Sequence, residues 1–236
     1  MNVLITGASR GIGAAIARRL AAPGRTILIN YLQNHTAAFS VARHVEEQGG
    51  TPLVVQANVR DEEDLQRLAG TFPQVDVLVH NAAIGVLKPF DKIRTSQWDL
   101  TLESSLRPFW LLTKLCTFAE NSTVIGLSSM GSRQHVPGYA AIGAAKAGME
   151  ALTRQLAVEM APRTRVNTVC GGLTRTDALR YFGEGEKMIE FATRHTPLGR
   201  IAEPDDLAAV VELLVDPRSY WINGQVIVAD GGLSLR

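Results

Sequence analysis

Several features that would point to a specialised class of protein are scarce in this sequence of 236 residues. Its two cysteines, Cys116 and Cys170, lie too far apart for a Cys-x-x-Cys motif, and its five histidines never pair at the spacing of metal ligands. Neither a disulfide framework nor a zinc or other metal site is therefore predicted. No apolar run approaches the roughly eighteen residues that a membrane span requires.

Neither sign of charge predominates. The 24 basic residues nearly balance the 23 acidic residues, so we expect no nucleic-acid partner and no polybasic membrane surface. Small molecules or other proteins are the expected partners. The first apolar segment follows Met1 almost directly, which leaves no room for a signal peptide and favours a cytoplasmic protein.

What the sequence does contain is a regular alternation of short β-branched runs and longer amphipathic stretches. We expect a single-domain Rossmann-type α/β fold over residues 1–236, with a doubly wound, seven-stranded parallel sheet and helices on both faces. The expected strands are 2–6, 26–30, 52–56, 75–80, 123–128, 165–169 and 225–229. The expected helices are 11–22, 36–48, 61–71, 96–117, 139–160 and 203–215, with a shorter one at 186–195.

The first expected strand and helix are joined by a glycine-rich turn, Thr-Gly-Ala-Ser-Arg-Gly-Ile-Gly, over residues 6–13. Glycine permits a positive φ and lets a phosphate approach the backbone, and the start of the helix offers free amide groups and a positive dipole end. Because the turn lies between a strand and a helix, it predicts a dinucleotide site. The residues expected to line it are Gly7, Ser9, Arg10, Gly11, Ile12 and Gly13.

The end of the second expected strand bears on the choice of cofactor. It reads Asn30-Tyr31, and no Asp or Glu follows before Glu46. A carboxylate here would bind a ribose 2′-hydroxyl and repel a 2′-phosphate, with which Arg10 could pair instead. We therefore expect NADPH (NADP+) in preference to NADH. The alternative is that Arg10 is only solvated and that Asn30 accepts either cofactor.

Tyr139 stands seven residues before Lys146, and the position four before that lysine holds Ile142. On a helix both spacings lie on the stripe of the lysine, but roughly 6 Å and roughly 10 Å away along the axis. The longer spacing places the phenol about one turn further from the lysine, and so over a different atom of a substrate. Taken alone, the pair could equally be a packed aromatic residue and a solvated surface charge.

Together with other motifs, these features resemble the short-chain dehydrogenase/reductase family, and the similarity runs from the first strand to Asp230-Gly231-Gly232. Ser129, at the end of the fifth expected strand, matches the active-site serine of the family. Cys170-Gly171-Gly172 takes the place of its Pro-Gly turn. Further positions that the resemblance implies as cofactor contacts are Asn58, Val59, Asn81, Ala82, Ala83, Gly172, Thr174 and Thr176, together with Tyr139 and Lys146.

Two departures from the commonest family pattern matter. The seven-residue spacing of Tyr139 and Lys146 is the one used by enoyl-acyl carrier protein reductases, and segments such as Ser-Ser-Met-Gly-Ser-Arg are most similar to the type III enzymes. The second departure is Ser105, which stands where the family has a catalytic asparagine. A serine reaches less far, so a proton relay through this helix is in doubt.

The resemblance implies an NADPH-dependent enzyme that reduces the 2,3 double bond of an enoyl thioester, in fatty acid biosynthesis or a specialised pathway. Tyr139 would hydrogen-bond the thioester oxygen, and Lys146 would hold the ribose hydroxyls and lower the pKa of the phenol. Ser129 would give a second hydrogen bond, unless it only caps its turn. Two alternatives remain open, namely a 3-oxoacyl-thioester or polyketide carbonyl reductase and a non-catalytic sensor of nicotinamide redox state.

The segment 178–200 combines aromatic and aliphatic residues with glycines. We expect it to close over the acyl chain as a lid, unless its apolar residues only face the core. Its basic residues, together with Arg175, could attract an acyl carrier protein or a phosphopantetheine phosphate, or simply be solvated. Members of the family usually form homotetramers through their long helices and last strand, and the apolar residues of 96–117 are consistent with a tetramer or a dimer.

Overall fold

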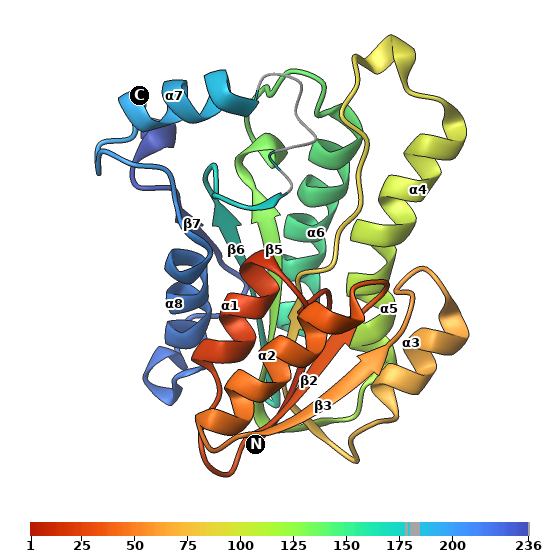
Figure 1. Cartoon of the computed structure of the whole chain (residues 1–236). Helices are drawn as coiled ribbons and strands as arrows, with labels where there is room; N and C mark the ends of the chain where they lie inside the picture. The colour runs from red at the N-terminus through yellow and green to blue at the C-terminus, as the bar shows by residue number, and fades with distance from the viewer. Residues whose placement is uncertain (178, 180–184, 236) are drawn as a thin grey trace.

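The computed structural model describes residues 1–177, 179 and 185–235 (Figure 1). Within these residues, seven strands form one parallel sheet in the order β3-β2-β1-β4-β5-β6-β7. The strands are β1 (Asn2–Ile5), β2 (Thr26–Tyr31), β3 (Thr51–Gln56), β4 (Val75–His80), β5 (Phe118–Ser129), β6 (Thr164–Gly171) and β7 (Val226–Ala229). The expected doubly wound parallel sheet and each of its expected strands are confirmed.

Helices cover both faces of this sheet, as Figure 1 shows. They are α1 (Gly11–Arg19), α2 (His35–Glu47), α3 (Glu62–Ala69), α4 (Thr95–Ser105), α5 (Arg107–Leu115), α6 (Ala140–Glu159), α7 (Gly185–His195) and α8 (Pro204–Val215). One buried cluster lies beneath α1, α2 and α8, and a second lies beneath α3, α5 and α6. Among the described residues, no helix has the length and apolar character needed to cross a membrane.

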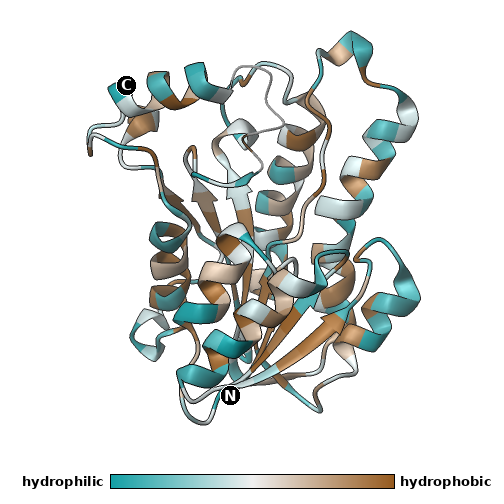
Figure 2. Ribbon diagram, viewed as in Figure 1, coloured by the Kyte–Doolittle hydropathy of each residue, from teal (hydrophilic) through white to brown (hydrophobic). Residues whose placement is uncertain are grey.

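The two cores explain why the central strands are apolar without alternation. In β1, Val3 and Ile5 belong to the core under α1, whereas Leu4 belongs to the core on the opposite face. Successive side chains of a strand point to opposite faces, so a strand covered on both faces needs apolar residues throughout. Figure 2 shows this apolar character along the strands and more polar surfaces on the surrounding helices.

The prediction of a single helix over 96–117 is wrong, because α4 ends at Ser105 and α5 begins at Arg107. Pro108 accounts for the break. Proline has no amide hydrogen to donate to the carbonyl of Ser104, and its ring would collide with that carbonyl in a continuous helix. The chain therefore turns at Leu106 (φ −106°, ψ −54°), and the carbonyl of Ser105 accepts a hydrogen bond from Nε2 of His80 at 3.1 Å.

Candidate active site

The glycine turn after β1 is packed directly against the loop after β4. Gly7 has a φ of +63°, and a Cβ at this position would lie 2.9 Å from the Cα of Ala82. A Cβ at Gly13 would lie 2.5 Å from Nδ2 of Asn81. That amide donates hydrogen bonds to the carbonyls of Thr6 (3.0 Å) and Gly7 (2.9 Å). Glycine is therefore required at both positions, and Asn81 fixes the shape of the turn.

Thr6 and His80 form a buried network beneath this turn, which the sequence analysis missed. The hydroxyl of Thr6 accepts hydrogen bonds from the amides of Asn81 (3.1 Å) and Ala82 (3.0 Å), and lies 3.3 Å from Nδ1 of His80. With its acceptor positions occupied, the hydroxyl donates to Nδ1, so the imidazole carries its proton on Nε2. Burial lowers the pKa of His80 to about 3, and the side chain is neutral.

Asn30 uses its side chain inside the protein. Its Oδ1 accepts from the amide of Gly7 at 3.1 Å, and its Nδ2 donates to the carbonyl of Ala57 at 3.0 Å. The residue is 2% exposed. Its amide therefore ties the glycine turn to the ends of β2 and β3, and Tyr31 beside it is also buried.

The start of α1, at the end of the glycine turn, has no side-chain cap. Arg10 is exposed and is the N-cap residue of α1, yet no side chain caps the first amides of this helix. Free amides and a guanidinium at a helix start suit the phosphates of a dinucleotide. After β3, Oδ1 of Asn58 accepts a hydrogen bond from the amide of Arg60 at 3.1 Å, and Val59 is buried.

Tyr139 is the N-cap residue of α6, and Ser129 is the last residue of β5. Their oxygens, Oη and Oγ, lie 2.8 Å apart. The structure thus brings together two residues that are ten apart in the sequence, with the phenol turned toward the serine. Burial raises the pKa of the Tyr139 phenol more than the Ser129 hydrogen bond lowers it. The prediction of a lowered phenol pKa is therefore wrong, because the uncharged form is favoured by desolvation.

Lys146 lies on α6, about two turns after Tyr139. Its ammonium donates a hydrogen bond to the carbonyl of Leu127 in β5 at 2.6 Å, and the residue is 6% exposed. The alternative of a solvated surface charge is therefore wrong. Burial lowers the pKa of Lys146 to about 8, because a charge removed from water is destabilised.

The turn after β6 completes the edge of the site. A Cβ at Gly172 would lie 2.9 Å from the Cα of Asp230, and Oγ1 of Thr174 donates to the carbonyl of Gly172 at 3.1 Å. A Cβ at Gly11 would lie 3.5 Å from Cγ2 of Thr176. The β1 and β6 turns therefore meet above the carboxyl ends of the strands, which is where ligands bind in open α/β sheets.

Ser105, at the position of the family asparagine, is turned to the loop after β4. Its Oγ donates to the carbonyl of Ile84 at 3.2 Å, and Oγ of Ser104 donates to the same carbonyl at 2.7 Å. Both serines are buried. The side chain of Ser105 thus holds this loop in place.

Part of the segment expected to be a lid packs as a small core. Leu179, Ala192 and Ile201 form an apolar cluster with neighbouring side chains, whereas Phe191 is 61% exposed. Arg175 forms an ion pair with Glu203 at 2.9 Å. Residues 178 and 180–184 of this segment lie outside the described residues.

The parallel sheet, the glycine turn after β1, the tyrosine that caps α6 and the lysine within α6 together define a dinucleotide-binding oxidoreductase of the Rossmann type. A family model described as enoyl-(acyl carrier protein) reductase matches residues 7–234. The chain belongs to the short-chain dehydrogenase/reductase family.

Relatives of known activity cover nearly the whole chain. A 3-oxoacyl-[acyl-carrier-protein] reductase from Synechocystis sp. is 34% identical over 98% of this chain and 95% of its own length. A 1-cyclohexenylcarbonyl-CoA reductase from Streptomyces collinus is 35% identical over 98% of this chain and 86% of its own length. The chain is thus similar to reductases of two kinds of thioester.

Solved structures agree with this assignment. A short-chain dehydrogenase from Burkholderia cenocepacia J2315, in complex with NADP, is 30% identical, with a TM-score of 0.90 over 98% of this chain and 97% of that one. A promiscuous reductase that catalyses keto-reduction in lugdunomycin biosynthesis is 29% identical, with a TM-score of 0.91 over 100% of this chain and 98% of that one.

Proposed function

We propose that this protein is an NADPH-dependent reductase of the 2,3 double bond of an enoyl thioester. The observation that carries the proposal is the position of Tyr139, seven residues before Lys146, with its protonated phenol 2.8 Å from Ser129. The description of the matching family model supports it. The name of the Streptomyces collinus relative also describes a thioester whose carbonyl is conjugated to a double bond.

The residues at the ends of the strands fit a bound dinucleotide. We propose that the amides of the glycine turn hold the pyrophosphate and that Arg10 pairs with a 2′-phosphate, since no carboxylate stands at the end of β2. Thr174 and Thr176 would flank the nicotinamide. When bound, NADPH would supply a hydride to the β-carbon of the substrate.

Two hydroxyl groups, those of Tyr139 and Ser129, would stabilise the negative charge that develops on the thioester oxygen. Because the Tyr139 phenol keeps its proton, it would donate a hydrogen bond to this oxygen and could afterwards give that proton to the enolate, with water restoring the phenol. The hydroxyl of Ser129 would donate a second hydrogen bond to the same thioester oxygen, or it would hold the phenol of Tyr139 in place. Lys146 would hold the ribose hydroxyls of a bound dinucleotide, and its ammonium would add positive charge at this end of the sheet.

A second candidate is a carbonyl reductase acting on a 3-oxoacyl thioester or polyketide. The Ser129–Tyr139 pair favours it too, because two hydroxyls at 2.8 Å can clamp a ketone oxygen as well as a thioester oxygen. The Synechocystis relative and the lugdunomycin reductase both act on keto groups, as their names state. The retained tyrosine and lysine argue against a non-catalytic redox sensor.

The two candidates are separated by NADPH oxidation with crotonyl and acetoacetyl thioesters. We expect faster turnover of the crotonyl substrate and NADPH in preference to NADH. In Tyr139→Phe we expect kcat to fall by about 10²-fold or more, because a positioned acid or oxyanion donor contributes about that much. Faster turnover of acetoacetyl thioester would select the carbonyl reductase, and inactivity with both substrates but tight NADPH binding would select the sensor.

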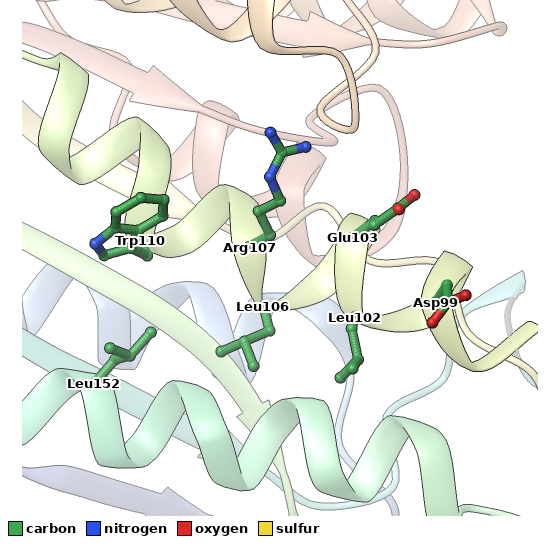
Figure 3. Close-up of a pocket in the computed structure, with 7 residues that line it drawn as sticks. All are labelled: Asp99, Leu102, Glu103, Leu106, Arg107, Trp110 and Leu152. Atoms are coloured by element: carbon green, nitrogen blue, oxygen red, sulfur yellow. The ribbon is translucent and has the colours of Figure 1, made fainter. Parts of the chain in front are cut away.

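We propose that the chain forms a homotetramer or a dimer. An apolar groove of about 420 Å³ lies between α4, α5 and α6 (Figure 3). Leu102 and Leu106 point toward α6, Leu152 points back from it, and Trp110 lies at one end, whereas Arg107 points away. Such a groove suits the helices of a second copy.

We further propose that the chain is a single short-chain dehydrogenase/reductase domain over residues 1–236, that it works in the cytoplasm and that its thioester is carried by acyl carrier protein or coenzyme A. The carrier protein rests on the Synechocystis relative, whose name includes this partner. Since Arg175 is paired with Glu203, its charge is already partly balanced in the free protein.

A further inference from the structure

The ring of Tyr139 lies against a residue that has no side chain. A Cβ at Gly131 would come within 3.0 Å of Cδ1 and Cε1 of the ring. Gly131 is not among the glycines with a positive φ, so its backbone conformation is open to any residue. The tyrosine ring is therefore the reason that this position must be glycine.

Gly131 is itself pressed against α6. A Cβ at Gly143, one turn into the helix, would lie 2.5 Å from the carbonyl oxygen of Gly131. The amide of Gly143 donates to the carbonyl of Tyr139 at 2.7 Å. The short turn Met130–Ser132 thus rests on the helix backbone, and the phenol ring fills the space next to it.

A buried carboxylate fastens this turn to α6. Glu150 is 5% exposed, and its Oε1 accepts hydrogen bonds from Oγ of Ser128 (2.7 Å) and Oγ of Ser132 (2.6 Å). Its Oε2 accepts from Nε of Arg133 at 3.0 Å. These three partners flank Ser129 and Gly131 on both sides, and a buried charge with several donors holds its neighbours firmly.

The position that the commonest family pattern gives to tyrosine is filled by another contact. A Cβ at Gly85 would come within 3.0 Å of Cγ1 and Cδ1 of Ile142. Ile142 is therefore packed against the loop after β4. The phenol of Tyr139 lies about one turn earlier, at the start of α6.

We propose that Gly131 is a positioning residue that gives the Tyr139 ring its place, and that Glu150 holds Gly131 there. This inference rests on the proposed function, because it explains how a phenol at the seven-residue spacing reaches Ser129. It predicts that any side chain at position 131 moves the phenol, whatever substrate the protein reduces.

The first test follows the tyrosine ring without substrate. The chain has four tyrosines, so ring-labelled tyrosine gives a simple NMR spectrum in which Tyr139→Phe identifies the Tyr139 signal. We expect Gly131→Ala to shift that signal and leave the other three in place. Gly70→Ala is the control, since Gly70 ends α3 with a φ of −80°, and it should leave all four unchanged.

The second test uses stability. We expect Gly131→Ala to lower the melting temperature when Tyr139 is present and to have no effect in a Tyr139→Ala background, because the clash is then removed. An equal loss in both backgrounds, or an unmoved Tyr139 signal, would overturn the role of Gly131. Both readouts are independent of turnover, so they stand even if neither thioester is a substrate.

The kinetic test separates positioning from binding. We expect Gly131→Ala and Glu150→Ala to lower kcat with the better thioester by roughly tenfold or more, since small displacements of a reacting group have large effects on rate. The Kd for NADPH should change less than about twofold. Glu150→Gln keeps an acceptor for the serine hydroxyls and should recover most of the activity that Glu150→Ala loses. The role of Glu150 would be refuted if two results came together: Glu150→Gln as slow as Glu150→Ala, and a Tyr139 signal that neither variant shifts.

Discussion

At the scale of single residues, Lys146 is the group whose protonation state the proposed reaction depends on most. Burial lowers its pKa to about 8, whereas burial raises the pKa of Tyr139. As the pH rises through about 8, the lysine thus loses its charge while the phenol keeps its proton. We therefore expect Lys146 to set the high-pH limb of the proposed activity.

We expect kcat/KM, which reports groups of the free enzyme, to fall above about pH 8. Lys146→Arg, which keeps its charge, should be slower but lack this fall. An unfolded lysine holds its proton up to its ordinary pKa of 10.5, so this residue makes the free energy of unfolding rise with pH between about 8 and 10.5. A flat kcat/KM profile to pH 9.5 would contradict the assignment.

His80 affects the stability of the protein at acidic pH, whereas Lys146 affects it at alkaline pH. Its folded pKa of about 3 lies below the ordinary value of 6.5, so the unfolded chain binds a proton that the folded chain excludes. The stability that depends on neutral His80 is therefore present above pH 6.5 and is lost as the pH falls toward 3. We expect the free energy of unfolding, measured in urea, to fall less between pH 7 and pH 4.5 in His80→Asn than in the unaltered protein. An equal fall in both would contradict this.

The sequence predicted the main members of the candidate site but not their surroundings. The glycine turn, Ser129, Tyr139 and Lys146 could be located because their spacing and their order along the chain are preserved in local motifs. The internal use of Asn30 and the neutral state of His80 could not be predicted. Each depends on partners from other elements, such as Gly7 and Ala57 for Asn30 and Thr6 and Ser105 for His80.

At the scale of elements, hydrophobic periodicity located strands and helices well because both faces of the sheet are covered. It failed in 96–117, where apolar residues continue across the break at Leu106. Pro108 was the signal that could have shown the break, since proline is accepted in the first turn of a helix but not in its interior. At the break, the amide of Phe109 donates to Leu106 instead of Ser105, and the carbonyl of Ser105 accepts the hydrogen bond from His80.

Helix α3 offers a measurable capping interaction. Asp61 is its N-cap residue, and its side chain accepts a hydrogen bond from the amide of Asp64. We expect Asp61→Ala to lower the free energy of unfolding by about 1 kcal/mol, whereas Asp61→Ser should be nearly neutral. Because the cap lies away from Tyr139, kcat should be unchanged. Equal stability of the two variants in urea denaturation would contradict the capping role.

At the scale of the whole molecule, the groove of Figure 3 is the surface on which the proposed assembly is tested. Trp110 is 42% exposed and lies at one end of it. We expect Trp110→Glu to reduce the assembled mass in light scattering, because a carboxylate would be buried at the interface. Phe39→Glu, with a comparable 46% exposure on α2, is the control and should leave the mass unchanged. A monomeric unaltered protein would contradict the proposed assembly.

The contact between the turn after β1 and the loop after β4 has a consequence for the order of events. The two segments are about 75 residues apart in the chain. Gly7 and Gly13 are nevertheless packed so closely against Ala82 and Asn81 that one segment cannot shift without the other. In the proposed function, a nucleotide seated on the first segment would therefore brace the second. If the proposed function holds, this coupling would favour a compulsory sequence in which the nucleotide arrives before the acyl compound and leaves after it.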